Sequence, residues 1–248
     1  MPPQISIIVP LFNEAGNVQP LVQQVLAAFA KETRPFELVL VDDASTDDTW
    51  ALIERAHRAD PRVRGLRHAH NCGQSAALWS GFRATRSPII ATLDGDLQND
   101  PADFPALLPL LETHDLVCGV RVRRQDNALR LFSTKVARAA TKAILGKVFQ
   151  DPGCGIRVFR RSVLDTLFPF NGLHRFMALL VFSAGGTVAE VPGNHRPRAA
   201  GISKYGVWNR MGRGLADLLA IRWYLKRRID PRGVAIGAAV GGGSDQGT

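Results

Sequence analysis

Apolar residues in the first 120 positions form short continuous runs that alternate with longer stretches of helical spacing. Residues 5–9 are a run typical of a buried strand, and the apolar residues of 18–29 recur at i, i+3, i+4 and i+7, which predicts an amphipathic helix. Further strands are predicted at 36–41, 63–66, 89–93 and 116–120, and further helices at 47–56, 75–84 and 101–113. This alternation predicts an α/β fold with a mostly parallel sheet, covered by helices through right-handed crossovers.

Polar side chains follow four of the predicted strands, at the point where each strand ends. The segments are 10–14, 42–47, 71–74 and 94–98. Open parallel sheets bind ligands beyond the carboxyl ends of their strands. A single acidic loop is usually a helix cap, but four such strand ends together indicate a ligand site. No G-x-G-x-x-G motif follows the first strand and no G-x-x-x-x-G-K-[ST] motif occurs, which disfavours dinucleotide and P-loop binding.

The fourth strand runs directly into Asp94, Gly95 and Asp96, with Gln98 two positions further on. In extended chain, residues i, i+2 and i+4 share one face, so the three polar side chains are expected to converge, and Gly95 permits close approach. Converging oxygen ligands suit a hard divalent cation, Mg²⁺ or Mn²⁺. The alternative is a helix-capping turn, since Asp100 before a proline predicts an N-cap. The other polar strand ends favour the metal site, and both interpretations can hold because they concern different residues.

The sequence after residue 120 is less regular. Helices are predicted at 131–148 and 205–226, strands within 151–161 and at 188–191, and a basic loop at 196–205. One face of the last helix is predicted to be apolar, comprising Val207, Trp208, Met211, Leu215, Leu218 and Leu219. No linker is apparent, so a single domain is expected over 1–228, followed by a disordered tail at 229–248.

The chain of 248 residues has a net charge of +9, and this charge is unevenly distributed along the sequence. Residues 1–120 carry a net −6, whereas 121–161 carry +9 and 196–232 carry +8. Basic segments attract polyanions such as nucleic acid, phosphorylated ligands or an anionic membrane. A nucleic-acid-binding module would interleave exposed aromatic residues with the basic ones. Here Phe and Trp fall mostly on predicted apolar faces, so we expect no nucleic-acid partner.

The cysteine spacing and the hydropathy of the chain indicate its redox compartment and the kind of membrane attachment to expect. Cys72, Cys118 and Cys154 are widely spaced without a C-x-x-C motif, so we expect neither a disulfide framework nor a zinc site, and a reducing compartment. Neither a signal-peptide pattern nor a run of about 18 apolar residues is visible in the sequence. Any membrane attachment is therefore expected to be peripheral.

Seven short motifs occur in order along the chain. They lie at 9–14 (VPLFNE), 41–47 (VDDASTD), 71–74 (NCGQ), 93–101 (LDGDLQNDP), 119–121 (GVR), 151–161 (DPGCGIRVFRR) and 195–205 (HRPRAAGISKY). Each is weak alone, but together they resemble family 2 glycosyltransferases of the polyprenyl-phosphate branch, such as dolichol-phosphate mannosyltransferases and undecaprenyl-phosphate glycosyltransferases. The resemblance covers roughly residues 4–228. It implies a GT-A fold, with a nucleotide-sugar-binding half at 1–120 and an acceptor half with basic helices at 121–228.

The resemblance also implies roles for particular residues. Those implied around the nucleotide and donor are Pro10, Asn13, Glu14, Asp43, Asp94 and Arg198. Those implied for the metal and the donor diphosphate are Asp94, Asp96 and Gln98. Those implied for the acceptor phosphate are Arg121, Arg130 and Thr134. Asp96, Arg121 and Lys204 would act in catalysis, with Arg198 and Lys204 on a basic loop that closes over phosphates.

The implied reaction moves a sugar, with inversion, from GDP-mannose or a UDP-sugar to dolichyl or undecaprenyl phosphate at the cytoplasmic face of the membrane. The attacking phosphate oxygen is already anionic, so the reaction does not require a strong general base. The metal and Lys204 would neutralise the leaving diphosphate. Basic helices at 131–148 and 205–228 would lie against anionic lipid. The alternatives are a soluble or polysaccharide acceptor, the nucleic-acid-binding module considered above, and an inactive scaffold.

Several polar residues have structural interpretations that compete with functional ones. Asp47 is expected to cap a helix, and His174 to be structural. Arg160 and Arg161 are expected on a solvated or membrane-facing surface. For Arg157 the sequence supports a structural ion pair and a role in the site equally well.

Overall fold

The computed structural model describes residues 1–121, 141–143, 146, 148–194, 196 and 207–228, with 207–215 as backbone. Four of the predicted site residues, Arg130, Thr134, Arg198 and Lys204, lie outside the described residues. Most of the predicted helix 131–148 and the predicted tail 229–248 also lie outside them.

The first half of the chain forms the predicted alternation of strands and helices. Its strands are β1 (Ile5–Leu11), β2 (Phe36–Asp42), β3 (Val63–Arg67), β4 (Ile89–Thr92) and β5 (Leu116–Arg121). Its helices are α1 (Ala15–Ala28), α2 (Thr49–Ala59) and α3 (Gln74–Ala84). The predicted helix 101–113 consists of three short pieces, η1 (Pro101–Asp103), α4 (Phe104–Leu107) and η2 (Leu108–Glu112). Prolines at 105 and 109 explain the division, because proline cannot donate a backbone hydrogen bond within a helix.

The second half adds β6 (Arg157–Arg160), η3 (Arg161–Thr166), α6 (Leu173–Ser183), β7 (Val188–Gly193) and α7 (Val207–Arg227). The sequence did not predict α6, because its continuous apolar run at 176–182 is equally consistent with a buried strand. Two residues of the apolar face predicted for α7 have described side chains: Leu218 is buried, whereas Leu219 is 54% exposed.

Seven strands form one sheet in the order β3-β2-β1-β4-β6-β5-β7. Neighbouring strands are parallel except that β6 runs antiparallel to both β4 and β5. The pairing of Leu11 with Asp42 brings the carboxyl ends of β1 and β2 together. The antiparallel direction of β6 brings its first residue, Arg157, opposite Thr92 at the carboxyl end of β4. The sheet therefore gathers residues from both halves of the chain at one edge.

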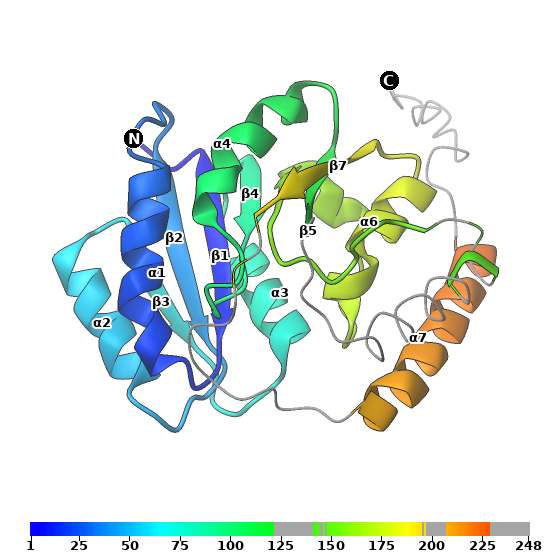
Figure 1. The fold of residues 1–248 in the computed structure, drawn as a ribbon, viewed down its shortest axis with the longest axis horizontal. Coiled ribbons are helices and arrows are strands. Elements are labelled where there is room, and N and C mark those ends of the chain that lie inside the picture. Colours follow the sequence, from blue (N-terminus) through cyan, green and yellow to red (C-terminus); the bar gives the residue numbers. More distant parts are fainter. Residues whose placement is uncertain (122–140, 144–145, 147, 195, 197–206, 229–248) are drawn as a thin grey trace, which may run out of the picture.

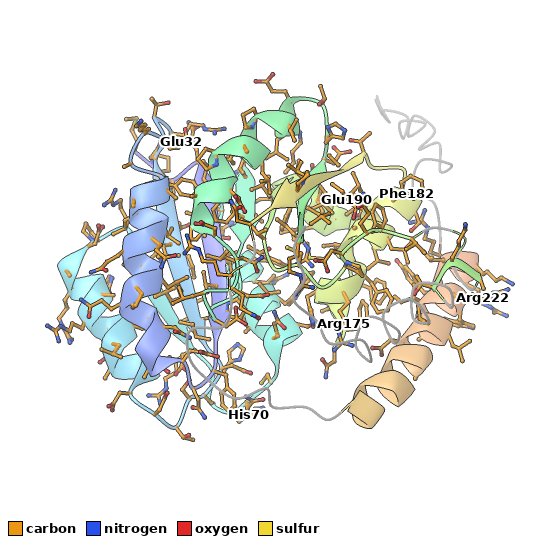
Figure 2. All side chains as sticks on the ribbon, viewed as in Figure 1. Glu32, His70, Arg175, Phe182, Glu190 and Arg222 are labelled. Carbon is orange, nitrogen blue, oxygen red and sulfur yellow. The ribbon has the colours of Figure 1, made fainter. Side chains whose placement is uncertain are left out.

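Helices cover both faces of the sheet (Figure 1). On one face the β1 residues Ile5, Ile7 and Val9 pack with apolar residues of α1, α2 and α4. On the other face Ile8 packs with α3 and α6, and α7 lies against this second cluster through Leu218 and Ile221. Side chains fill the space between these layers (Figure 2). Strands buried on both faces explain the continuous apolar runs in the sequence.

The position of α3 depends on a close approach to the sheet. A Cβ atom on Gly81 would lie 2.4 Å from Cγ2 of Ile8, so the helix reaches β1 because position 81 has no side chain. This approach sets the first residue of α3, Gln74, beside the carboxyl end of β4. There Gln74 contacts Asp94.

Candidate active site

The four polar strand ends lie at one edge of the sheet, as predicted. The strands β3, β2, β1 and β4 are adjacent and parallel, so the loops that follow them share that edge. Loop 71–74 leads from β3 into α3, and segment 94–98 follows β4 directly. The described part of the predicted site therefore forms one connected region.

The loops after β1 and β2 are tied together by hydrogen bonds. The backbone N–H of Asn13 donates to Ser45 Oγ at 2.9 Å, and Asn13 Oδ1 accepts from the Thr46 N–H at 2.8 Å. Asn13 has φ of 53°, in the left-handed region that asparagine tolerates. Of the other predicted nucleotide residues on this strand, Pro10 is half-buried, and Glu14 accepts a hydrogen bond from Asn17 at 2.5 Å. The Asn13 side chain thus supports the loop on which any nucleotide would rest.

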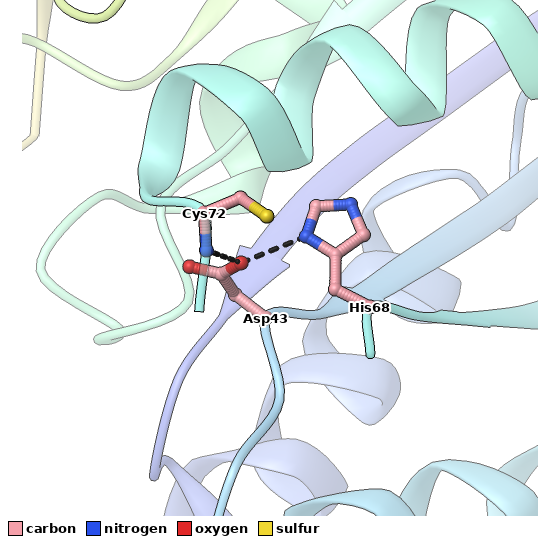
Figure 3. Close-up of side chains that lie close together, drawn as sticks. All are labelled: Asp43, His68 and Cys72. Atoms are coloured by element: carbon pink, nitrogen blue, oxygen red, sulfur yellow. Dashed lines mark hydrogen bonds and ion pairs between the residues drawn. The ribbon is translucent and has the colours of Figure 1, made fainter. Parts of the chain in front are cut away.

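Asp43 is buried directly after β2, and both its carboxylate oxygens accept hydrogen bonds. Oδ1 accepts from the Cys72 N–H at 2.8 Å and from His68 Nδ1 at 2.7 Å (Figure 3). Oδ2 accepts from the Gly73 N–H at 2.7 Å. Asp43 therefore fixes the loop that leads into α3. Asp47, by contrast, accepts from the Thr49 N–H at the start of α2 and from the Ala15 N–H at the start of α1. The N-cap residue of α2 is Asp48 and not Asp47, so the capping role expected for Asp47 is replaced by contacts with the first residues of two helices.

The segment after β4 presents its polar residues in alternation, but the chain is not extended as predicted. Asp94, Asp96 and Gln98 are half-buried, whereas the residues between them are buried. A turn begins at position 95, and Leu97 has φ of 60°. The expectation of extended chain is therefore wrong, because β4 ends at Thr92 and the alternation comes from a compact turn. Asp96 Oδ1 accepts from the Gln98 N–H at 3.2 Å within this turn.

The carboxylate of Asp94 is tightly enclosed. Gln74 Nε2 donates to its Oδ1 at 2.8 Å. A Cβ atom on Gly155 would lie 2.2 Å from its Cγ, so the backbone of residue 155 packs directly on the carboxylate. Burial and the charge of Asp96 raise the pKa of Asp94 to about 6, although Arg157, Arg121 and the Gln74 hydrogen bond act in the opposite direction.

Arg121, at the carboxyl end of β5, forms a bidentate ion pair with Asp151. The Nε and Nη2 atoms donate to the two carboxylate oxygens at 2.6 and 2.7 Å. The backbone next to Asp151 is also fixed, because the Gln150 N–H donates to Glu190 Oε1 at 2.6 Å. The ion pair fixes the orientation of the planar guanidinium group. It also balances the charge of Arg121.

Arg157 is 4% exposed and lies at the start of β6, where its guanidinium donates to Pro152 O at 3.0 Å. Its positive charge lowers the pKa of Asp94, against the effect of burial. The sequence left the role of Arg157 open and gave Asp151 and Gln74 no separate role. Gln74 and Asp151 lie within two of the seven motifs, but their contacts depend on long-range packing, which short-range patterns do not encode. The close approach of α3 to β1 sets Gln74 beside Asp94, and the chain before β6 sets Asp151 beside Arg121.

The structure also describes His174, Arg161 and Arg196, for which the sequence makes separate predictions. His174 Nδ1 and Ser75 Oγ form a hydrogen bond of 2.7 Å, and burial lowers the pKa of His174 to about 3. Arg161 is half-buried and donates to Ser87 O at 2.6 Å and to Thr85 Oγ1 at 2.9 Å. The expectation that Arg161 is a solvated surface residue is therefore wrong, because its guanidinium group satisfies acceptors at the carboxyl end of α3. Arg196, which opens the predicted basic loop, donates its N–H to Gln98 O at 2.8 Å.

The oxygen atoms of Asp94 and Asp96 fit a hard divalent cation. The raised pKa of Asp94 reflects mutual repulsion of these carboxylates as well as burial, and a bound cation would relieve both. Such carboxylate pairs, completed by water and phosphate oxygens, are typical magnesium and manganese sites. Gln98 lies in the same turn, and its backbone carbonyl is engaged by Arg196.

Comparison with known families decides which class of site this is. The model of the family described as "Glycosyl transferase family 2" matches residues 6–168. The chain belongs to glycosyl transferase family 2. It is therefore a glycosyltransferase, and the acidic strand ends lie within the matched region.

Two relatives of this chain have names that refer to polyprenyl phosphates. Dodecaprenyl-phosphate galacturonate synthase of Rhizobium johnstonii is 34% identical over 237 residues, which cover 92% of this chain and 69% of the relative. Undecaprenyl-phosphate 4-deoxy-4-formamido-L-arabinose transferase of Pseudomonas syringae is 36% identical over 203 residues, which cover 81% and 60%. The chain spans 69% of the length of the first of these proteins and 60% of the second.

Solved structures share the fold of this family 2 chain. Glucosyl-3-phosphoglycerate synthase from Mycobacterium tuberculosis in complex with UDP has a TM-score of 0.68 at 22% identity, covering 89% of this chain and 80% of that chain. Its complex with Mn²⁺, UDP-glucose and phosphoglyceric acid has a TM-score of 0.67 at the same identity, covering 89% and 79%. The likeness confirms the expected GT-A glycosyltransferase fold.

Proposed function

We propose that this glycosyltransferase moves a sugar, with inversion, from a nucleoside-diphosphate sugar to a polyprenyl phosphate. The proposal rests mainly on the juxtaposition of the acidic turn at Asp94 and Asp96 with the arginines Arg121 and Arg157. One end of such a site suits a metal-bound diphosphate, and the other suits an acceptor phosphate. The names of the two relatives support a polyprenyl-phosphate acceptor.

In this proposal an oxygen of the acceptor phosphate attacks the anomeric carbon, and the nucleoside diphosphate leaves from the opposite side. The nucleophile is anionic, so the residues around it orient it and need not remove a proton. A divalent cation held by Asp94 and Asp96, with Gln98 in the same turn, would neutralise charge on the leaving diphosphate. Gln74 and Gly155 keep the Asp94 carboxylate in place for that role.

Arg121 is proposed to orient the acceptor phosphate. Because Asp151 balances its charge, further cations are needed to attract a phosphate dianion. We assign that part to Arg198 and Lys204 of the basic loop and to Arg130, and we assign Thr134 to the acceptor phosphate as well. All four lie outside the described residues. Arg196 supports this placement, since its N–H bond to Gln98 O starts the loop beside the acidic turn.

We further propose that α7 holds the enzyme on the cytoplasmic face of a membrane. Leu219 and Trp223 are 54% and 63% exposed, one helical turn apart. Arg222, Lys226 and Arg227 are exposed around them, and Arg222 projects outward from the helix (Figure 2). Exposed apolar residues bordered by cations suit the headgroup region of anionic lipid. In the part of the chain described by the structure, no helix is long and apolar enough to cross a bilayer.

The donor and acceptor can be identified with a panel assay. Purified enzyme with Mg²⁺ or Mn²⁺ is mixed with GDP-mannose, UDP-glucose, UDP-galacturonate or a UDP-amino sugar, together with undecaprenyl phosphate in vesicles. We expect one donor to yield a lipid-linked sugar and a stoichiometric amount of nucleoside diphosphate. Transfer only to a soluble phosphorylated acceptor or to a polysaccharide would overturn the lipid assignment while leaving the donor chemistry intact.

A further inference from the structure

Three side chains with different ligand atoms converge in the part of the site that follows β2 and β3. They are Asp43 after β2, His68 after β3 and Cys72 in the loop before α3 (Figure 3). One oxygen, nitrogen or sulfur atom from each lies within 4.8 Å of the other two. The sequence spacing of these residues does not match a zinc motif, because the sheet and not a local motif brings them together.

We propose that Asp43, His68 and Cys72 bind a borderline-soft divalent cation such as Zn²⁺. A mixed carboxylate, imidazole and thiolate set favours zinc over magnesium, whereas the oxygen atoms of Asp94 and Asp96 favour the harder ions. Three protein ligands leave a fourth tetrahedral position for water. The two ends of the site would therefore sort cations by hardness.

The geometry requires only small side-chain movements. Tetrahedral zinc places its ligand atoms about 3.5 Å apart. His68 Nδ1 and Asp43 Oδ1 are now 2.7 Å apart, so they must separate slightly. Cys72 is exposed, and its Sγ atom makes a 3.3 Å contact with His70 O. Rotation about χ1 of an exposed cysteine can bring the sulfur to the cation at low cost.

Neighbouring groups already support the ligands in the way that metal sites require. The second ring nitrogen of His68, Nε2, lies 2.9 Å from Ser80 Oγ on α3. The Gly73 N–H donates to the other oxygen of Asp43 at 2.7 Å. Partners of this kind fix the orientation of a histidine and a carboxylate, and their loss typically lowers metal affinity about 10- to 100-fold.

The proton balance of binding is simple. With a neutral His68 ring, Nδ1 donates to Asp43 and Nε2 can accept from Ser80. Binding at Nδ1 moves that proton to Nε2, from which it donates to Ser80 Oγ. The Cys72 thiol releases its proton to solvent, so one proton leaves per cation bound and no redox change occurs.

Zinc at this site would oppose donor binding. This consequence rests on the proposed function, in which Asp43 contributes to the nucleotide site. A cation on Asp43 Oδ1 would occupy the carboxylate and the space in front of it. Binding of the cation itself does not depend on that function, so the two ideas can fail separately.

Cobalt substitution tests the site without an activity assay. Metal-free, reduced enzyme is titrated with Co²⁺, and a sulfur-to-cobalt charge-transfer absorption in the near ultraviolet is recorded. We expect this absorption to saturate at one equivalent and to disappear when Zn²⁺ is added. Absence of the absorption in the folded wild-type enzyme would overturn the proposal.

Matched variants locate the ligands. Cys72→Ser and His68→Gln should abolish the absorption, whereas His70→Gln, an exposed histidine two residues away, should retain it. Ser80→Ala should weaken Zn²⁺ binding about tenfold or more. Circular dichroism checks that each variant folds. Survival of the absorption in Cys72→Ser, or its loss in His70→Gln, would contradict the assignment.

Discussion

Asp94 is enclosed so closely that its neighbours determine what the carboxylate can do. Gly155 packs on one side, Gln74 donates a hydrogen bond on another, and Asp96 adds a like charge. Thr92 Oγ1 donates to the carbonyl of Gly155 at 2.8 Å, which keeps the backbone of residue 155 in position. At the residue scale the acidic turn is therefore a packed arrangement and not a pair of free carboxylates.

Gly155→Ala should displace the Asp94 carboxylate. The new Cβ would lie 2.2 to 2.5 Å from its carboxyl atoms, far inside van der Waals contact. We expect turnover to fall about tenfold or more, with weaker Mn²⁺-dependent binding of nucleoside diphosphate, measured by calorimetry. Gly16→Ala is the matched control, because a Cβ at that position in α1 meets no atom within 4 Å. Equal donor binding in the two variants would show that the packing on Asp94 is unimportant.

Asp94→Asn should stabilise the metal-free protein at neutral pH. The folded protein keeps a proton on Asp94 up to pH about 6, whereas the unfolded chain loses it near 3.8. The free energy of unfolding therefore falls as pH rises between these values and stays lower above them. The amide introduced at position 94 does not ionise, so the variant keeps this free energy of unfolding as pH rises. With a metal chelator present, its melting temperature should exceed the wild-type value at about pH 7.5. The difference in melting temperature should shrink towards about pH 4.

The exposed Asp165 offers a control for this experiment, since Asp165→Asn makes the same chemical change away from the site. Scanning fluorimetry across the pH range gives the comparison. An Asp94→Asn variant that melts with or below the wild type at about pH 7.5 would contradict the account of Asp94.

At the scale of elements, the sequence predicted those strands and helices whose apolar residues have a clear local period. Strands β1 to β5 and helices α1 to α3 have apolar runs or amphipathic spacing of their own, and they occur as expected. Helix α6 was not predicted, because a continuous apolar run such as 176–182 does not distinguish a helix from a buried strand. The contact of Gly155 with Asp94 was also missed, since it depends on β6 running antiparallel beside β4. Short-range patterns do not specify such pairings.

Charge reversal on α7 should release the enzyme from anionic vesicles. Each basic residue near such a surface contributes about 1 kcal/mol, so Arg222→Glu, Lys226→Glu and Arg227→Glu together should lower partitioning about 100-fold or more. Vesicle flotation at low salt measures the change. Reversal of Arg55, Arg58 and Arg83, which are exposed on α2 and α3, alters net charge equally and should have a smaller effect. Equal losses from both triple variants would remove α7 from the membrane surface.

At the scale of the whole molecule, the two halves of the chain supply opposite charge to one edge of the sheet. Residues 1–120 carry a net −6 and contribute the acidic turn, while the basic segments lie after residue 120. The antiparallel strand β6 and the parallel strand β5 carry Arg157 and Arg121 to that edge. The arrangement suits transfer between two phosphate-bearing substrates, one held through a metal and one through cations. Family membership fixes glycosyl transfer as the reaction class.

The most direct test of this account is single-turnover transfer to undecaprenyl phosphate by the wild type and by Asp96→Asn. With the preferred donor and saturating Mn²⁺, we expect the wild type to form one lipid-linked sugar of inverted anomeric configuration per nucleoside diphosphate released. We expect the folded Asp96→Asn variant to form essentially none, because one of the two carboxylates proposed to hold the metal is lost. Near-normal transfer by Asp96→Asn, or product with retained configuration, would contradict the account.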